Sequence, residues 1–200
     1  MIALPNYADI NGRPMKKLQI QQYLRKLQLN DFEPAVNLAT LTKLQDAHLK
    51  YIPYENFDSL NGKITSLKRQ DMFNKVIMHN RGGICFELNG LYNWLLESLG
   101  FEVTSYAARF IDKMETYQLR RHRVMCVALG EKRYLTDVGV NSESPRVPLE
   151  ITEGLIQSDG ISQYKFTRSE FWGWLLWQKE RGKIWKRLFG FTEEPQIDKD

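Results

Sequence analysis

Cysteine and histidine are scarce in this 200-residue sequence, which has two cysteines and three histidines. Two cysteines do not form the disulfide framework of a small secreted protein. With three histidines they also show no spacing that is typical of a metal site. The sequence therefore predicts no bound metal and no disulfide scaffold.

Long apolar runs and a leader segment are missing as well. No run approaches the roughly 18 residues that a membrane span requires. The N-terminus, MIALPNYADINGRP, has no basic segment followed by an apolar one, so we expect no signal peptide. These two absences predict a cytoplasmic protein with no membrane partner.

The composition is that of an ordinary globular protein, with 42% hydrophobic and 12% aromatic residues. The net charge is +4, and residues 165–187 hold seven Lys or Arg residues against two Glu. A basic strip of this kind attracts anions such as a nucleotide-bearing cofactor. A solvated face is the default explanation for it. No nucleic-acid motif accompanies the strip, so we expect no nucleic-acid partner.

Apolar residues recur at helical spacing through the first half, which predicts a helical lobe over residues 1–100. Thr40 and Ser66 are the expected caps of the second and third helices, and Gly100 is the expected stop of the fourth. The four apolar faces are Leu18, Tyr23, Leu24 and Leu27; Leu41, Leu44, His48 and Ile52; Met72, Phe73, Val76 and Ile77; and Leu88, Leu91, Tyr92, Leu95 and Leu99.

The second half changes to short runs of branched and aromatic residues between Gly, Asp and Asn turns, which predicts strands over residues 101–200. These runs are FEVTSYAARF, RVMCVAL, RYLTDVGV, SQYKFTR, FWGWLLW and KIWKRLFGF. Helices followed by antiparallel strands are typical of an α+β protein. No Pro/Ser linker separates the halves, so we expect the two lobes to share an interface.

The stretch RGGICFELNG, residues 81–90, places Cys85 behind two glycines at the start of the fourth apolar helix. Exposed N–H groups and the helix dipole at such a position favour a negative charge, which suits a thiolate nucleophile. A buried, inert thiol is the more common role of a lone cysteine. A nucleophile would further require a base and an orienting group.

His122 and Asp137 are the candidates for those two roles. A two-residue loop at Gly130-Glu131 would set Asp137 opposite Val124, which puts His122 and Asp137 on one face as diagonal neighbours. A three-residue loop would send them to opposite faces. Of the other histidines, His48 is expected in the apolar core and His79 at an exposed or capping position. Cys126 is expected to be buried and inert.

Four segments in this order resemble the arylamine N-acetyltransferase family: HLKYIPYENFDSLNG, RGGICFELNGLYNWLLESLGF, RHRVMCVAL and YLTDVGV. The resemblance covers roughly residues 20–198, and its Arg-Gly-Gly-x-Cys-x-Glu motif is highly specific. It implies a helical first lobe, a β-barrel second lobe and a catalytic triad of Cys85, His122 and Asp137, similar to that of cysteine proteases.

The implied reaction is acetyl transfer from acetyl-CoA, through a cysteine acyl-enzyme, to an arylamine, hydrazine or N-hydroxyarylamine in detoxification. Two open alternatives use the chain differently. One is a thiol hydrolase or amide-forming acyltransferase that relies on the same triad. The other is a degenerate, non-catalytic binding module.

The sequence departs from the family pattern in two places. Val140-Asn141 stands where the family usually has Phe-Gly, and that aromatic residue typically lines the acceptor pocket. The family also continues well past FTEEPQID into a third lobe, a lid that helps to hold CoA, so we expect the lid to be absent and activity to be reduced. In its place Lys183 and Lys186 are candidate contacts for the CoA phosphates, with salt-sensitive binding.

Overall fold

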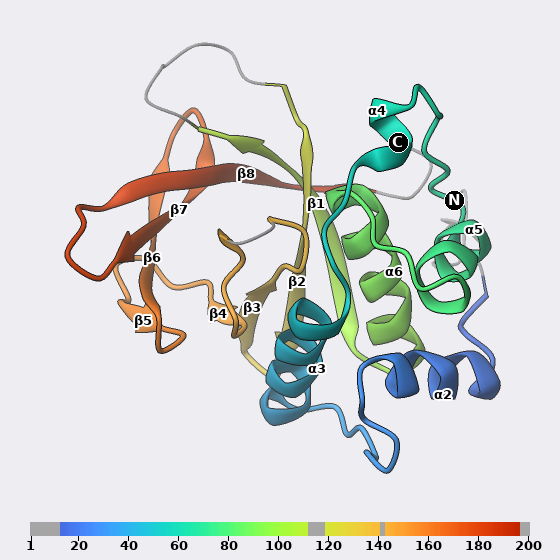
Figure 1. Ribbon diagram of the computed structural model, residues 1–200. Helices are drawn as coiled ribbons and strands as arrows, with labels where there is room; N and C mark the ends of the chain where they lie inside the picture. The colour runs from blue at the N-terminus through green and yellow to red at the C-terminus, as the bar shows by residue number, and fades with distance from the viewer. Residues whose placement is uncertain (1–12, 112–118, 141–142, 197–200) are drawn as a thin grey trace, which may run out of the picture.

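Helices precede strands in the computed structural model, which describes residues 13–111, 119–140 and 143–196 (Figure 1). The helical elements are α2 (Lys17–Lys26), α3 (Leu38–Tyr51), α4 (Phe57–Leu60), α5 (Arg69–Phe73), the π-helix η1 (Asn74–Met78) and α6 (Cys85–Ser98). The strands are β1 (Glu102–Phe110), β2 (His122–Leu129), β3 (Lys132–Thr136), β4 (Leu149–Glu150), β5 (Gln157–Ser158), β6 (Ser162–Ser169), β7 (Gly173–Glu180) and β8 (Lys186–Gln196).

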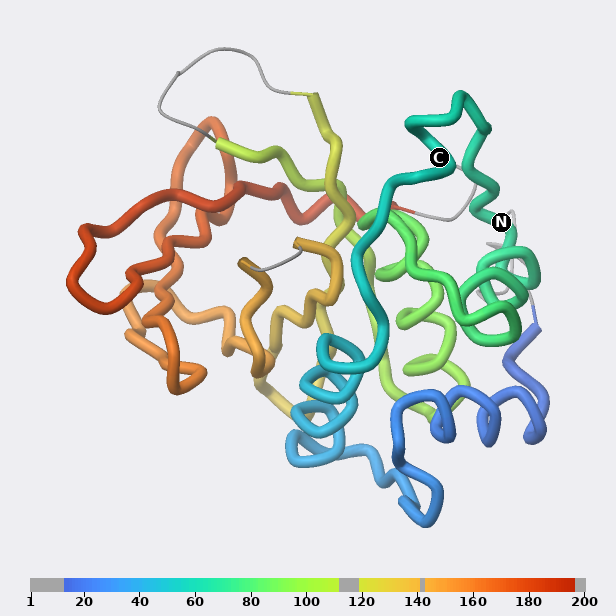
Figure 2. Tube along the Cα trace, in the orientation of Figure 1, coloured from blue at the N-terminus to red at the C-terminus, as the bar shows by residue number. Residues whose placement is uncertain are grey.

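All eight strands form one antiparallel sheet in the order β4-β3-β2-β1-β8-β7-β6-β5, which curls into a nearly closed barrel (Figures 1 and 2). Side-chain bonds link the two edge strands. The amide of Gln157 on β5 donates to the Glu150 carbonyl on β4 at 2.9 Å, and its oxygen accepts from the Glu150 N–H at 2.7 Å. These bonds satisfy backbone groups that an open edge would leave unpaired. The predicted α+β class and β-barrel are thereby confirmed.

The sheet separates two hydrophobic clusters because side chains alternate along each strand. Val103, Met125 and Val127 belong to the cluster that contains the buried faces of the helices. Val124 and Cys126, one position away on β2, belong to the cluster inside the barrel. The helices therefore cover the outer face of β1–β3, and the helical and strand regions share a core.

The predicted helix starts are wrong at two positions. Asn37, not Thr40, caps α3, since its side chain accepts a hydrogen bond from the Thr40 N–H at 2.8 Å. Lys68 precedes the first residue of α5, and Ser66 lies outside the helix, with its hydroxyl on Asp71 at 2.6 Å. The four predicted apolar faces are buried or half-buried except for Leu18, which is 64% exposed.

The start and the end of α6 agree with the prediction. The helix begins at Cys85 and ends at Ser98, and Gly100 follows with a φ of 92°, a left-handed conformation that glycine adopts without strain. No helix of the described residues is long and apolar enough to cross a membrane.

The predicted register of the β2–β3 hairpin is confirmed. Leu129 pairs with Lys132 and Met125 pairs with Thr136, as a two-residue loop at Gly130-Glu131 requires. The ladder ends at Thr136, so Asp137 follows the strand instead of lying within it. The sequence analysis did not predict β4 and β5, which are two residues long each.

Candidate active site

Cys85 is the first residue of α6, and the side chain of Glu87 holds the start of this helix. Glu87 Oε2 accepts a hydrogen bond from the Ile84 N–H at 2.9 Å, which satisfies one of the free donors that every helix has at its N-terminus. The Glu87 carboxylate also lies near the positive end of the helix dipole. Cys85 is therefore fixed at a helix start, and only 8% of its surface is exposed.

Gly82, three residues before Cys85, permits a close approach of two backbone segments. A Cβ atom on Gly82 would lie 2.0 Å from the Pro53 carbonyl oxygen, so only glycine fits there. The next residue continues this contact, since the Gly83 carbonyl accepts from the Glu55 N–H at 3.0 Å. This packing ties the segment before α6 to the Pro53–Glu55 segment.

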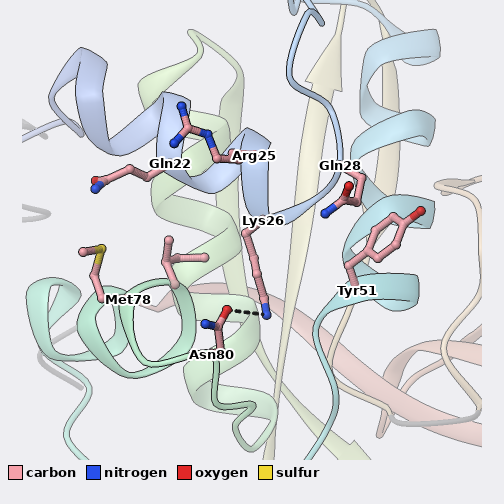
Figure 3. Close-up of a pocket in the computed structure, with 8 residues that line it drawn as sticks. Gln22, Arg25, Lys26, Gln28, Tyr51, Met78 and Asn80 are labelled. Carbon is pink, nitrogen blue, oxygen red and sulfur yellow. Dashed lines mark hydrogen bonds between the residues drawn. The ribbon is translucent and has the colours of Figure 1, made fainter.

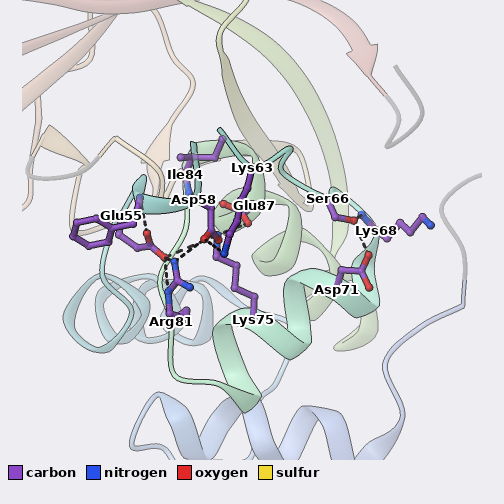
Figure 4. Close-up of polar contacts among 11 residues, drawn as sticks. Glu55, Asp58, Lys63, Ser66, Lys68, Asp71, Lys75, Arg81, Ile84 and Glu87 are labelled. Carbon is purple, nitrogen blue, oxygen red and sulfur yellow. Dashed lines mark hydrogen bonds and ion pairs between the residues drawn. The ribbon is translucent and has the colours of Figure 1, made fainter. Parts of the chain in front are cut away.

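A network of ion pairs also holds the segment before α6 (Figure 4). Arg81 contacts Glu55 at 2.8 Å and Asp58 at 3.3 Å, while Lys75 contacts Glu87 at 2.8 Å and Asp58 at 3.0 Å. The hydrogen bond from Lys75, with help from Arg81, lowers the pKa of Asp58 to about 2. Two cations and three carboxylates thus connect η1, α4 and the first turn of α6.

His122 and Asp137 form a fully buried pair at one end of the barrel. Nε2 of His122 lies 2.7 Å from Oδ2 of Asp137, and both side chains are 0% exposed. Burial by itself lowers the pKa of His122, but the charge and hydrogen bond of Asp137, with a smaller effect of Cys85, raise that pKa to about 9. The imidazolium form is therefore favoured at neutral pH.

Cys85 lies near this imidazole. Interaction with Cys85 is one of the causes of the raised His122 pKa, which places the sulfur near the ring. In the described residues Nδ1 of His122 has no partner with hydrogen-bond geometry, and the Cys85 thiol lies 3.4 Å from the Arg121 carbonyl oxygen. Because Asp137 holds Nε2, Nδ1 is the ring nitrogen that the carboxylate leaves free.

Asn89, which the sequence analysis did not identify, organises the other side of Asp137. Its amide nitrogen donates to Asp137 Oδ1 at 2.9 Å and to the Arg123 carbonyl at 2.5 Å, and its oxygen accepts from the Val138 N–H at 2.9 Å. Asn89 is four residues after Cys85 and so lies on the same face of α6. A polar residue on an otherwise apolar face was the available signal.

Gly139 closes the site from the loop that follows β3. Its N–H donates to Asp137 Oδ1 at 2.8 Å. A Cβ atom at this position would lie 2.8 Å from the Cα of Cys85 and 2.8 Å from the Asn89 side-chain nitrogen. The close approach of this loop to the start of α6 therefore depends on glycine.

Aromatic side chains surround the imidazole. The ring of His122 lies 5.1 Å from that of Phe110 and 5.2 Å from that of Phe189, centre to centre. Tyr54 lies near the thiol, since burial and then the charge of Cys85 raise the pKa of this phenol. The sequence analysis did not identify these three aromatic residues, which come from separate parts of the chain.

The remaining histidines and the second cysteine lie outside this site. His48 is fully buried in the helical core, and His79 is exposed at the end of η1. Cys126 is 4% exposed inside the barrel, where burial raises its thiol pKa to about 11. The burial predicted for His48 and Cys126 is confirmed.

The other sequence candidates have different surroundings. Lys183 pairs with Glu180 at 2.6 Å, and Lys186 pairs with Glu143 and, at 3.5 Å, with Glu180. The described residues contain no group of three or more His, Cys, Asp or Glu placed to hold a metal ion. Val140 is buried in the barrel cluster, while its neighbour at position 141 lies outside the described residues.

A surface groove of about 420 Å³ lies elsewhere, between α2, the end of α3 and η1 (Figure 3). Polar side chains dominate its lining, and Lys26 donates to Asn80 across it at 3.0 Å. Gln28 and Asn80, which both line the groove, have positive φ angles of 58° and 55°. No residue of the Cys85–His122–Asp137 group contributes to this groove.

Comparison with known proteins identifies the class to which this fold and site belong. Residues 37–200 match the N-acetyltransferase family. The chain is 35% identical over 180 residues to an arylamine N-acetyltransferase of Mycolicibacterium smegmatis, covering 87% of this chain and 64% of that protein. The chain belongs to the arylamine N-acetyltransferase family, as its motifs had indicated.

Two further comparisons give similar coverage of the chain. The solved structure of the Salmonella typhimurium arylamine N-acetyltransferase superposes with a TM-score of 0.84 at 26% identity, over 91% of this chain and 65% of that one. A proansamycin X synthase of Amycolatopsis mediterranei is 30% identical over 188 residues, covering 91% of this chain and 70% of that protein. The chain spans about two thirds of the length of these relatives.

Proposed function

We propose that this chain transfers an acetyl group from acetyl-CoA to an arylamine, hydrazine or N-hydroxyarylamine through an acyl-enzyme on Cys85. The observation that carries the proposal is the buried His122–Asp137 pair, 2.7 Å apart, beside a cysteine at a helix start. Membership of the arylamine N-acetyltransferase family supports the choice of donor and acceptor.

In the resting pair the proton of Cys85 is on Nδ1 of His122, and the first half-reaction begins when the Cys85 thiolate attacks the thioester carbonyl carbon. A new C–S bond forms to Cys85, the C–S bond to CoA breaks, and the leaving thiolate takes the proton from the imidazolium. Asp137 holds Nε2 and stabilises the imidazolium, as the acid of a serine-protease triad does. The N-terminus of α6 stabilises the thiolate that attacks.

In the second half-reaction, the amine nitrogen attacks the acetyl carbon on Cys85. His122 accepts the proton that the amine loses, an N–C bond forms, and the bond to the Cys85 sulfur breaks. The thiolate–imidazolium pair is then restored without any redox change or metal ion. The flat ring of an arylamine suits the rings of Phe110 and Tyr54, which are each 39% exposed.

Lys183 and Lys186 are the candidate contacts for the CoA phosphates. Each ammonium group is already paired with a glutamate, so a phosphate contact requires that pair to open. We therefore expect acetyl-CoA to bind weakly and to lose affinity as the salt concentration rises.

Steady-state kinetics test this function directly. Release of free CoA thiol is followed while acetyl-CoA is varied at several fixed concentrations of an arylamine and, separately, a hydrazine. Parallel double-reciprocal lines and an N-acetylated product are expected, because the acyl-enzyme forms before the acceptor binds. Thiol release that ignores the acceptor would assign a hydrolase, and no release with any donor would assign a non-catalytic binding module.

A second candidate is an amide-forming acyltransferase that uses the same triad on another acyl donor. The relative named proansamycin X synthase favours it, because that synthase is 30% identical to this chain, close to the 35% of the Mycolicibacterium smegmatis acetyltransferase. Replacement of the aromatic residue usual in the family by Val140 would change the shape of the acceptor pocket. Faster turnover of longer acyl thioesters than of acetyl-CoA would select this candidate.

A further inference from the structure

We propose that the β7–β8 hairpin, with the turn beside it, is a docking surface for an anionic lipid bilayer. The surface consists of Lys165, Lys179, Arg181, Ile184, Trp185 and Arg187, together with Ile161 in the neighbouring turn, and is called the hairpin surface below. This goes beyond acetyl transfer and does not depend on it. The sequence predicted a solvated face here and no membrane partner, and the proposal departs from both expectations.

Strand register gathers these residues in one place. Ser162 on β6 pairs with Glu180 on β7, so the turn that carries Ile161 lies beside the loop between β7 and β8. Trp177 pairs with Lys165 on one side and with Arg187 on the other, which puts both cations on its face of the sheet. Figure 1 shows the β7–β8 hairpin projecting away from the helices.

The positive charge of the hairpin surface is largely unneutralised. Glu180 and Glu143 pair with Lys183 and Lys186. Four other cations, Lys165, Lys179, Arg181 and Arg187, have no acidic partner within the part of the chain that the structure describes. Clusters of this size attract anionic lipid headgroups, and each cation near the surface contributes to binding.

Apolar and aromatic side chains accompany these charges. Ile184 is 86% exposed at the tip of the hairpin and Ile161 is 63% exposed in the adjacent turn. Lys165 Nζ lies 4.6 Å from the ring centre of Trp185, and the indole N–H of Trp177 donates to Thr167 at 2.8 Å. Exposed isoleucines can enter the acyl boundary, while Trp, Lys and Arg favour the headgroup layer.

Single-stranded nucleic acid is another polyanion that binds to surfaces of cations and aromatic rings, but it fits this surface less well. Base stacking requires ring faces that are open to solvent. Trp185 lies beneath Lys165, and the most exposed apolar side chains are aliphatic. Aliphatic tips between cations are what a lipid interface accommodates.

The hairpin surface lies at the barrel end that holds the candidate active site. Phe189 on β8 pairs with Phe110, whose ring contacts His122. β8 begins at Lys186, three residues before Phe189, a distance of about 10 Å along an extended strand. Docking through the hairpin would therefore hold the His122 end of the barrel towards the lipid.

Vesicle co-sedimentation of the full chain tests the proposal. We expect binding to vesicles of phosphatidylcholine with one third phosphatidylglycerol at low salt, loss at high salt, and no binding to pure phosphatidylcholine. Arg181→Glu/Arg187→Glu should reduce the partition coefficient more than about tenfold. Its matched control, Lys17→Glu/Arg25→Glu on the exposed face of α2, makes the same charge change and should bind like wild type.

A second pair of variants distinguishes insertion of Ile184 into the bilayer from electrostatic attraction alone. Ile184→Asp should weaken binding severalfold, whereas Ile64→Asp, at a site that is 99% exposed, should not. Far-ultraviolet circular dichroism checks that each variant is folded. Equal loss in both charge variants, binding to neutral vesicles, no binding at low salt, or tighter binding of a single-stranded oligonucleotide than of vesicles would each overturn the proposal.

Discussion

Two buried histidines occupy nearly the same kind of aromatic cage and titrate in opposite directions. His48 lies between the rings of Tyr23 and Tyr92, at 6.0 and 5.3 Å, and His122 lies between Phe110 and Phe189, at 5.1 and 5.2 Å. Burial lowers the pKa of His48 to about 3, yet the pKa of His122 is raised to about 9.

The difference between them is a carboxylate. Both ring nitrogens of His48 lack a hydrogen-bond partner among the described residues, whereas His122 has Asp137 at 2.7 Å. Desolvation disfavours the charged imidazole in both places, but a neighbouring anion more than offsets it in one. The helical core thus keeps a neutral histidine, and the barrel end keeps a cationic one.

Asp137→Asn should break this contrast with the largest effect. Without the anion, burial should dominate at His122 and bring its pKa below the unperturbed 6.5. The corresponding change in a serine triad lowers kcat about 10⁴-fold, and we expect a loss of that order here. Imidazole titration by NMR and single-turnover acetylation measure the two effects.

Asp31→Asn is the matched control for that experiment, since Asp31 is exposed and lies far along the chain from the site. It should leave both measurements unchanged. An Asp137→Asn enzyme that keeps wild-type turnover, or a His122 titration that does not move, would contradict the role of the carboxylate.

Asn89→Ala should sharpen the comparison by loosening the carboxylate without removing it. Asp137 Oδ1 would keep only the Gly139 N–H, and the Val138 N–H would lose its partner. We expect a fall in kcat of about 10- to 100-fold with a stability loss of about 1–3 kcal/mol. Urea denaturation and the pH profile of kcat provide the readouts.

Asn93→Ala, one turn later on α6, controls for stability alone. Asn93 is also buried, and its amide bonds to Glu97 at 2.8 Å. Its loss should destabilise the fold to a similar degree while kcat is retained. If the two variants lower kcat equally, Asn89 has no positioning role.

His48→Leu should remove one pH dependence of stability. The unfolded chain protonates His48 below pH 6.5, but the folded chain keeps it neutral down to about pH 3. Stability therefore falls as pH falls through that window, by about 2 kcal/mol between pH 7 and 5. The variant should lose this slope in urea titrations, and an unchanged slope would show that His48 is not the titrating group.

His122 contributes in the opposite sense. Its folded pKa of about 9 exceeds 6.5, so its stabilising effect is complete below pH 6.5 and is lost as pH rises towards 9. The His48→Leu variant should keep this alkaline loss, which distinguishes the two histidines in one protein.

The two cysteines allow a similar comparison of two buried groups, and here we expect the smallest effect. Iodoacetamide at pH 7 should label Cys85 in the native protein and spare Cys126, whose pKa is raised to about 11 by burial. Cys126→Ala should leave kcat unchanged. Peptide mapping locates the label, and equal labelling of both thiols would contradict the difference between them.

Local patterns in the sequence were sufficient for much of this fold. The helical spacing from Leu88 to Leu99 predicted α6, and the loop at Gly130-Glu131 predicted the register that brings His122 and Asp137 onto one face. The strands β4 and β5 are too short for a periodic signal. Glu55, Asp58 and Lys75 meet only through tertiary packing, so their ion pairs could not be predicted from spacing.

The candidate site also combines residues that a local pattern predicts with residues that only tertiary packing brings together. Cys85, His122 and Asp137 stood out because each has a local motif or a paired strand. Asn89 was not identified because its partners, Val138 N–H and the Arg123 carbonyl, belong to a loop and a strand whose approach to α6 is not encoded locally. The aromatic cage of His122 likewise combines β1 and β8, which are distant in sequence.

Intact-protein mass spectrometry after brief exposure to acetyl-CoA, without any acceptor, tests the central claim most directly. The account predicts the added mass of one acetyl group, located on Cys85 by peptide mapping and lost when an arylamine is added. Cys85→Ser should show no such adduct while remaining folded. No adduct on the wild-type chain, or an adduct that persists in Cys85→Ser, would contradict the proposal that Cys85 carries the acyl group.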